Sequence, residues 1–456
     1  MYAIINPFYI LHMLTKENQD SYIEVLKREV KPALGCTEPI AVALAVAKAT
    51  EILQMQQEKP AKITVEVSAN ILKNAMGVGI PGTGMNGLYI ASALGACCGK
   101  SEYGLEVLRE VSPEYVDAAR EMVAANRIEI KLSQEDVKLF IKASCWSTHH
   151  TTSATIRDTH DHITETTLDG KCLETSSGKQ GHCTEKKDDQ FDIRSLGLTV
   201  ASIFEFAIEA PLGDIAFIRE SEKLNKAIAE EGLKHNYGLQ IGKTIRNRSH
   251  SSVFGQGILP YAMSLTAAAA DARMAGCTLP AMSNSGSGNQ GITVTLPVVA
   301  AAKQLKSTEE QLIRALALSH LIAIHIKTYL GRLSALCGCV VASSGAACGI
   351  TYLMGGGYTE VTYAIKNMIG NITGMVCDGA KAGCAMKVAS GTSSAVQSAI
   401  LAVDKICISE NDGIIESDIE KTIYNLGKVG TAGMQNTDSI MLNIMINKRG
   451  DTPICH

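Results

Sequence analysis

The sequence has few aromatic residues, little excess charge and few bulky apolar segments. Aromatic side chains make up 5% of the 456 residues, and there is one Trp, although apolar residues reach 46% and Gly is 40 residues. Such a composition predicts closely packed helices whose contact faces carry small side chains. The formal net charge of −4 is too balanced for a nucleic-acid or anionic-membrane surface. We therefore expect no nucleic-acid and no membrane partner.

Signals for export and for membrane insertion are also lacking. The apolar stretch Ala3 to Leu14 has no basic residue before it and no small-residue cleavage site, so we do not interpret it as a signal peptide. Leu333 to Thr359 has no charged residue, but it consists mainly of Gly, Ser, Cys and Ala, which favours a buried helix over a membrane span. A chain of this length does not need disulfides, so its 14 cysteines indicate thiols or metal ligands in a cytoplasmic protein.

Periodicity predicts an α+β protein with a predominantly helical body and a smaller α/β segment inserted after the N-terminal helices. Residues 1–59 are expected to form N-terminal helices that pack on this body, 60–190 the α/β segment and 191–456 the helical body itself. The expected strands are Lys62 to Val67, Ile128 to Leu132, Val137 to Ala143, Thr152 to Thr159 and Ile163 to Leu168. The expected helices begin with Glu17 to Val30 and Ile40 to Leu53 and continue to about Ile446. Thr175 to Asp189 is expected to be an exposed loop.

The most specific local signal is the segment Lys-Pro-Ala-Leu-Gly-Cys-Thr-Glu-Pro at 31–39. It places Cys36 directly before a helix that Thr37 or Glu38 can cap, and the unpaired amides there favour a thiolate. The alternative is that Cys36 is a packing residue, because cysteine is among the most buried residue types.

Four cysteines late in the chain form a second signal. Cys337 and Cys339 open the charge-free segment, and Cys377 and Cys384 enclose Asp-Gly-Ala-Lys-Ala-Gly. Neither a paired C-x₂-C zinc pattern nor a ferredoxin pattern is present. Three thiolates, those of Cys337, Cys377 and Cys384, can hold three irons of a [4Fe–4S] cube and leave the fourth open. The alternative is that these cysteines are small apolar residues of a tight core.

Two glycine-rich segments were considered as ligand loops. Pro81 interrupts Gly77 to Gly84, and no clear strand leads into it, which argues against a dinucleotide fold. The segment Ser-Asn-Ser-Gly-Ser-Gly-Asn-Gln-Gly at 283–291 precedes an expected helix, where amides and hydroxyls can bind a carboxylate. A plain turn or a close-packing site is the alternative. The candidate substrate-binding residues are Ser283, Ser285, Gly286 and Asn289.

The histidines carry less information. His160 and His162 would share one face of a strand, but their polar surroundings favour a solvated strand end over a metal site. His320 and His325 lie in an apolar helix and are expected to be core or interface residues with satisfied nitrogens.

Taken together, these motifs resemble the L-cysteine desulfidase family. The segment around Cys36, Gly-Ile-Pro-Gly-Thr-Gly at 79–84, the 283–291 loop and the segment from Cys377 to Cys384 occur in the same order. The C-terminal part is also similar to the α chain of iron–sulfur L-serine dehydratases. The resemblance covers about residues 20 to 446, but residues 60–190 do not match the β domain of those dehydratases.

The resemblance implies a [4Fe–4S] lyase, independent of pyridoxal phosphate, that converts L-cysteine and water to sulfide, ammonia and pyruvate. Cys337, Cys377 and Cys384 match the cluster ligands, and Cys36 matches the cysteine proposed to act as base. The dehydratases end in a cysteine that can reach the open iron, and here the penultimate residue is Cys455. The implied partner is a small-molecule amino-acid substrate, and assembly as a homo-oligomer stays open.

Three alternatives to this function remain open. The same cluster would serve an L-serine dehydratase, which differs only in the leaving group. A non-catalytic iron–sulfur sensor is possible from another class, although no basic patch supports DNA binding. A zinc-structured helical protein is the last alternative, and it would purify without colour.

Overall fold

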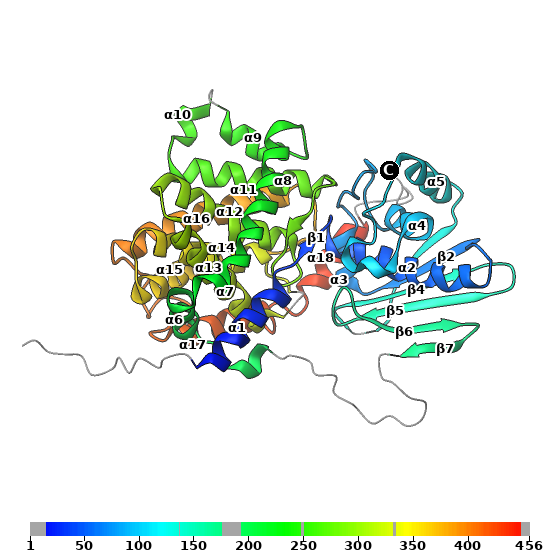
Figure 1. Cartoon of the computed structure of the whole chain (residues 1–456), viewed down its shortest axis with the longest axis horizontal. Helices are drawn as coiled ribbons and strands as arrows, with labels where there is room; N and C mark the ends of the chain where they lie inside the picture. The colour runs from blue at the N-terminus through cyan, green and yellow to red at the C-terminus, as the bar shows by residue number, and fades with distance from the viewer. Residues whose placement is uncertain (1–14, 136, 176–192, 248–249, 332–333, 448–456) are drawn as a thin grey trace, which may run out of the picture.

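A computed structural model describes residues 15–135, 137–175, 193–247, 250–331 and 334–447 as two lobes joined at one side (Figure 1). One lobe is helical and the other contains a sheet with helices on it, so the predicted α+β class is confirmed. Each lobe has its own hydrophobic core. The expectations for the apolar stretch from Ala3 to Leu14, for most of the 175–189 loop and for Cys455 lie outside the described residues.

The helical lobe is assembled around α14. This helix contacts α12, α13, α15 and α16, and residues without large side chains make the close approach to α13 feasible. A Cβ on Gly345 would lie 2.3 Å from the carbonyl oxygen of Ser319, which no real contact allows. The lobe consists of α1 (Lys16–Glu29), η2 (Ile193–Leu196), α6 (Val200–Glu209), α7 (Leu212–Ile215), η3 (Ala216–Ile218), α8 (Arg219–Lys234), α9 (Ile241–Arg246), α10 (Ser251–Phe254), α11 (Ile258–Met274), α12 (Gly288–Leu305), α13 (Glu309–Leu330), α14 (Gly338–Leu353), α15 (Tyr358–Ile372), α16 (Cys384–Val403) and α17 (Ile419–Gly430).

The charge-free segment forms α14, as the prediction of a buried helix required. Nearly all of its side chains are buried among neighbouring helices. Within the described ranges, no helix is long and apolar enough to cross a membrane. Between η2 and α6 the chain turns at Gly197, whose φ of +60° favours glycine, and α6 begins only after the Thr199 cap.

The sheet of the other lobe has six strands in the order β3-β2-β4-β5-β6-β7, and all pairs are antiparallel except β2 with β3. Helix α2 lies against it and is buried on nearly all sides, because α4 covers its other face. The elements are α2 (Thr37–Met55), β2 (Lys62–Val67), α3 (Ala69–Ala75), α4 (Leu88–Cys98), η1 (Ser101–Glu106), α5 (Pro113–Ala124), β3 (Ile128–Leu132), β4 (Phe140–Trp146), β5 (Thr151–Arg157), β6 (Ile163–Leu168) and β7 (Lys171–Thr175).

Alternation located β2, β3 and β6 correctly, but β4 begins three residues later than expected. Its register is set by pairing with β2, in which Ile141 faces Val67 and Trp146 faces Lys62. Of the two helices expected in 1–59, α1 packs in the core of the helical lobe, whereas α2 belongs to the core of the α/β lobe.

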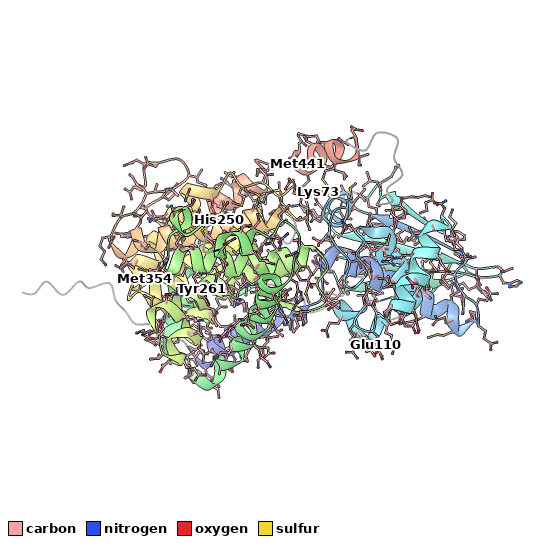
Figure 2. The ribbon with its side chains drawn as sticks, turned by 90° about the horizontal axis from the view of Figure 1, so that it is seen from above. Lys73, Glu110, His250, Tyr261, Met354 and Met441 are labelled. Carbon is pink, nitrogen blue, oxygen red and sulfur yellow. The ribbon has the colours of Figure 1, made fainter. Side chains whose placement is uncertain are left out.

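Several contacts join the lobes, and two of them place the site. Strand β1 (Pro32–Ala33), just before Cys36, pairs with β8 (Ala281–Met282), just before the 283–291 loop. Helix α18 (Thr437–Asn447) returns from the helical lobe and packs on α3, so that Met441 of α18 lies near Lys73 of α3 (Figure 2). Nζ of the buried Lys73 is 2.6 Å from Oδ1 of Asp438. These contacts bring the Cys36 segment, the 283–291 loop and the segment after α15 to one place.

Candidate active site

A small cavity of about 100 Å³ lies where these segments meet, and all five candidate cysteines from sequence analysis line it. Cys36 comes from the start of α2, Cys337 from the start of α14, and Cys377 and Cys384 from the segment that leads into α16. Cys339 also lines the cavity. The lining further includes Thr37, Glu38, Asn74, Arg273, Ser287, Asn289, Gln290, Gly338, Gly379, Ala380, Lys387 and Val388.

A short backbone pairing brings the late cysteines together. The N–H of Cys337 donates to the carbonyl of Met375 at 3.0 Å, and the N–H of Cys377 donates to that of Ala335 at 2.7 Å. Leu336 and Val376 form the antiparallel bridge between these two bonds. This bridge brings together Cys337 and Cys377, which are some forty residues apart in the sequence, a contact that the sequence spacing did not predict.

Cys337 and Cys339 differ in what their thiols do. The Cys339 thiol donates to the carbonyl of Lys387 at 3.1 Å and packs against Gly391, where a Cβ would lie 2.4 Å from the sulfur. Burial raises the pKa of Cys339 to about 11. Burial and the neighbouring Cys339 and Cys377 raise the pKa of Cys337, so this half-buried thiol lies close to other thiols.

Lys387 supplies a positive charge at this wall of the cavity. Its Nζ donates to the carbonyl of Val376 at 2.7 Å and is paired with the carboxylate of Asp378. Burial acts to lower the pKa of Lys387, but the bond to Asp378 outweighs it and the pKa is raised. Burial likewise acts to raise the pKa of Asp378, yet Lys381 and Lys387 hold it at about 2.

Cys36 is the N-cap residue of α2, as the sequence indicated, but its thiol is not activated by the helix. Sγ donates to Oε2 of Glu38 at 3.1 Å, and burial together with the Glu38 charge raises the pKa of Cys36. Desolvation and the neighbouring carboxylate therefore oppose the effect of the helix N-terminus on the Cys36 thiol. The N-terminus of α2 has no side-chain cap, and the Glu38 carboxylate accepts hydrogen bonds from neighbouring side chains.

Glu38 is the carboxylate among the described residues that line the cavity. Besides Cys36, the hydroxyl of Thr37 donates to Oε2 at 3.2 Å, and Nδ2 of Asn74 donates to Oε1 at 3.0 Å. Burial acts to raise the pKa of Glu38, but the charge of His160 and the bond from Cys36 lower it. Glu38 is thus ionised and held beside the Cys36 thiol.

His160 contributes to this field from the α/β lobe. It lies in the turn between β5 and β6 with 6% of its surface exposed, so the expectation of a solvated strand end is wrong. In the described part of the chain, no group of three or more His, Cys, Asp or Glu side chains could hold a metal ion.

The 283–291 loop reaches the cavity at its end and not at its beginning. Asn289 lines the cavity, whereas Ser283, Ser285 and Gly286 are not among the lining residues. The hydroxyl of Ser283 donates to the carbonyl of Lys31 at 2.7 Å, and that of Ser285 to Oδ1 of Asn284 at 3.0 Å. Both serines therefore support the loop and its pairing with the Cys36 segment, which corrects their assignment as substrate ligands.

A buried hydrogen-bond chain orients the end of this loop. Nε2 of Gln290 donates to Oδ1 of Asn284 at 2.8 Å, and Nδ2 of Asn284 lies 3.1 Å from Nδ1 of His320. Nε2 of His320 lies 3.1 Å from the Thr295 hydroxyl. Burial lowers the pKa of His320 to about 3, so His320 is a neutral core histidine with both nitrogens bonded, as expected.

Sequence reasoning missed Glu38, Asn74, Arg273, Gln290 and Lys387 as cavity residues. Arg273 carried a usable signal, because it and Asp271 are the two charged residues of the alanine-rich helix α11. In the structure Arg273 is only 3% exposed, and a charged side chain is almost never so buried unless it has a partner.

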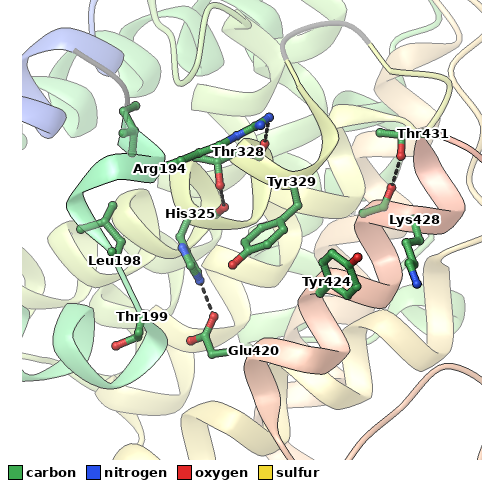
Figure 3. A pocket seen from close by; sticks show the side chains of 13 residues that line it. Arg194, Leu198, Thr199, His325, Thr328, Tyr329, Glu420, Tyr424, Lys428 and Thr431 are labelled. Carbon is green, nitrogen blue, oxygen red and sulfur yellow. Dashed lines mark hydrogen bonds and ion pairs between the residues drawn. The ribbon is translucent and has the colours of Figure 1, made fainter. Parts of the chain in front are cut away.

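A second, larger cavity of about 680 Å³ lies in the helical lobe, and none of the predicted site residues lines it. Figure 3 shows His325 and Glu420 facing each other beside Tyr329 and Tyr424. Nε2 of His325 is 2.7 Å from Oε2 of Glu420, so the expectation of a bonded histidine is confirmed here too.

The comparisons with known proteins agree with this architecture. A family model described as serine dehydratase alpha chain matches residues 102–443. A UPF0597 protein of Bacteroides thetaiotaomicron is 50% identical over 439 residues, which cover 96% of this chain and 100% of the relative. UPF0597 proteins of Phocaeicola vulgatus (49% over 441 residues, 96% and 100% covered) and Shewanella halifaxensis (46% over 433 residues, 94% and 98% covered) are similar along nearly their whole length. The chain therefore belongs to the serine dehydratase alpha chain family and, within it, is related to the UPF0597 proteins.

Proposed function

We propose that this protein is a cytoplasmic, iron–sulfur-dependent lyase that converts L-cysteine and water to sulfide, ammonia and pyruvate. Membership of the serine dehydratase alpha chain family supports a lyase of the dehydratase type. The observation that carries the proposal is that the Cys36–Glu38 pair and the thiols of Cys337, Cys377 and Cys384 line one cavity. A base and a cofactor site would then meet at one substrate.

The donor set fits a [4Fe–4S] cluster better than a single ion. Each thiolate of a cube binds a different iron, and the three thiols lie near enough for Cys377 and Cys384 to act on the pKa of Cys337. Lys387 provides a compensating positive charge beside Cys337 and Cys377. When bound, a cluster with three protein thiolates supplies a Lewis-acidic iron that can polarise a leaving group.

The chain's own residues supply the proton chemistry. Cys36 is the proposed base, and Glu38 is the group that can accept its proton, because the two are hydrogen-bonded at 3.1 Å. The resulting thiolate takes the α proton, the released electron pair forms the Cα–Cβ double bond, and the Cβ–S bond breaks with its electrons on sulfur. The proton held by Glu38 is then available to the departing sulfide. The enamine left behind tautomerises and is hydrolysed to pyruvate and ammonia.

L-serine is the second candidate substrate, because the matching family model is that of serine dehydratase. Elimination from L-serine would use the same base and differ only in the loss of hydroxide. A sensor without turnover is less well supported, since it has no need of a Cys–Glu pair beside the thiols.

The test is anaerobic purification followed by an iron and sulfide count, an absorption spectrum and pyruvate measurement with each amino acid. We expect close to four irons and four sulfides per chain and faster pyruvate formation from L-cysteine than from L-serine. Faster pyruvate formation from L-serine would make L-serine the substrate in place of L-cysteine. A protein that carries the cluster but forms no pyruvate from either amino acid would favour the sensor function. A colourless protein with zinc would contradict the proposal.

A further inference from the structure

Three buried polar atoms of the cavity-lining residues have no hydrogen-bond partner in the described part of the chain. They are one donor, Nε of Arg273, and two acceptors, Oδ1 of Asn74 and Oε1 of Gln290. A buried polar group without a partner destabilises the fold. Several such groups around one cavity indicate a ligand that carries both an acceptor and donors.

The unpaired donor belongs to the guanidinium of Arg273, which makes no ion pair with a carboxylate of the described residues. Nη2 of Arg273 donates to the carbonyl of Gly35 at 2.8 Å and Nη1 to Oδ1 of Asn289 at 3.2 Å, so both known bonds are to neutral oxygens. No ion pair joins Arg273 to a described acidic residue, although its positive charge acts to lower the pKa of both Cys36 and Glu38. The other lining cation, Lys387, is already paired with Asp378.

The guanidinium lies against the N-terminus of α12, where the helix dipole also favours an anion. A Cβ on Gly288, the first residue of α12, would lie 2.2 Å from Nε of Arg273, so glycine allows the contact. A buried cation and a helix N-terminus thus adjoin at the cavity. A carboxylate is the group that complements both, since it accepts several hydrogen bonds at once.

The orientation of the Asn74 and Gln290 side-chain amides is fixed by the hydrogen bonds of their NH₂ groups. Nδ2 of Asn74 must face Glu38, because a carboxylate only accepts hydrogen bonds, and so Oδ1 is the end left unpaired. Nε2 of Gln290 faces Oδ1 of Asn284, whose own Nδ2 is directed at the carbonyl of His320 at 3.3 Å. Two amide oxygens therefore remain as acceptors, which suits an ammonium group.

We propose that the cavity binds both charged groups of a small zwitterionic α-amino acid. Arg273 binds the carboxylate, and the amide oxygens of Asn74 and Gln290 bind the ammonium group. This inference rests on the proposed function and names the residues that would hold its substrate. It moves the carboxylate from the serines of the 283–291 loop to Arg273, with Asn289 and the start of α12 in support.

The experiment measures binding to the anaerobically purified full-length protein by titration calorimetry, using three matched probes. L-alanine has both charged groups and no leaving group, ethylamine lacks the carboxylate, and propionate lacks the amine. We expect the wild type to bind L-alanine at least 10-fold more tightly than either fragment. Arg273→Gln should weaken L-alanine about 100-fold and leave ethylamine unchanged, because a charge-assisted bidentate contact is lost.

Gln290→Met is the mirror test, and it should weaken L-alanine about 10-fold while leaving propionate unchanged. Arg120→Gln on α5, an arginine paired with Asp117 at the surface, is the matched control and should change no affinity. Circular dichroism checks that each variant is folded, and Arg273→Lys keeps the charge if Arg273→Gln does not fold. We expect Arg273→Lys to retain part of the L-alanine affinity, because it loses only the planar fork.

Equal weakening of L-alanine and ethylamine in Arg273→Gln would overturn the inference, as would unchanged L-alanine affinity or no L-alanine binding by the wild type. The two proposals fail in different ways. If the binding pattern holds but neither L-cysteine nor L-serine gives pyruvate, the proposed function fails and this inference stands. If Arg273→Gln forms pyruvate with an unchanged KM, this inference fails and the proposed function stands.

Discussion

The thiol of Cys36 donates a hydrogen bond to the carboxylate of Glu38, with Sγ 3.1 Å from Oε2, and both side chains are buried. The pair predicts that neither residue works alone. Cys36→Ser and Glu38→Gln should each lower pyruvate formation from L-cysteine at least about 100-fold, because general base catalysis contributes about that much or more. Iron content and absorption spectrum should stay at the wild-type level.

Cys407→Ser is the control for this prediction, since Cys407 lies outside the cavity lining and its thiol donates to the carbonyl of Ile408 at 3.3 Å. It should keep both activity and iron. Full activity in Cys36→Ser or Glu38→Gln would remove the pair from the mechanism.

Cys337 and Cys339 are two residues apart but are predicted to behave differently. Replacing Cys337, Cys377 or Cys384 by Ser should lower the iron bound per chain by more than half, because each removes one thiolate ligand. Cys339→Ser should keep the iron, since its thiol is engaged with the carbonyl of Lys387 and a hydroxyl can donate there as well. Iron and sulfide analysis of the four variants decides the assignment, and loss of iron in Cys339→Ser alone would reverse it.

The fold was predictable from sequence where a residue's environment is set by its immediate neighbours. Alternation gave β2, β3 and β6 with correct ends, and the Gly, Ala and Ser content of the charge-free segment indicated a packed helix. Helix α18 was not separated from the preceding helices, because its position depends on the contact between Lys73 and Asp438. Such a long-range contact has no local signal.

The candidate site divides along the same line. The cysteines were found because thiols are scarce and chemically distinctive, and four of the predicted residues, Cys36, Cys337, Cys377 and Cys384, line one cavity. The serines of the 283–291 loop were misassigned, because a hydroxyl near a helix start can bind a ligand or the backbone, and here both bind protein oxygens. The role of Arg273 depends on a bond to Gly35 from 238 residues away, which no local pattern shows.

His320 predicts how stability depends on pH. Burial lowers its pKa in the folded protein to about 3, while in the unfolded chain it titrates near 6.5. Between these values the unfolded state binds more protons, so this group makes the free energy of unfolding fall as pH decreases, by up to about 1.4 kcal/mol per pH unit. Well above pH 6.5 its effect disappears, because both states are then neutral.

Urea unfolding of the apo-protein at pH 7.5, 6.0 and 5.0 measures this dependence. His320→Gln should flatten the decline between pH 6.0 and 5.0, even though it is less stable at pH 7.5 because the bonds to Asn284 and Thr295 change. His235→Gln, at an exposed position, should leave the decline as in the wild type. An equal slope in His320→Gln and the wild type would show that His320 does not titrate as its burial requires.

The ion pair of Lys73 and Asp438 predicts a link between the docking of α18 and the cysteine segment. The Lys73 side chain is 2% exposed, and its Nζ donates to the carbonyl of Cys377 at 3.2 Å as well as to Asp438. Asp438→Asn leaves a buried cation without its partner, which should cost about 3 kcal/mol of unfolding free energy and also lower the iron bound per chain. Asp412→Asn, at an exposed position, is the control and should change neither the unfolding free energy nor the iron content.

The double variant Lys73→Met with Asp438→Leu removes both charges and should be more stable than Asp438→Asn, because apolar replacement of a buried pair is often neutral. If the double variant recovers stability but not iron, the bond from Lys73 to Cys377 positions the ligand segment, whereas equal iron in all variants would limit the pair to holding α18.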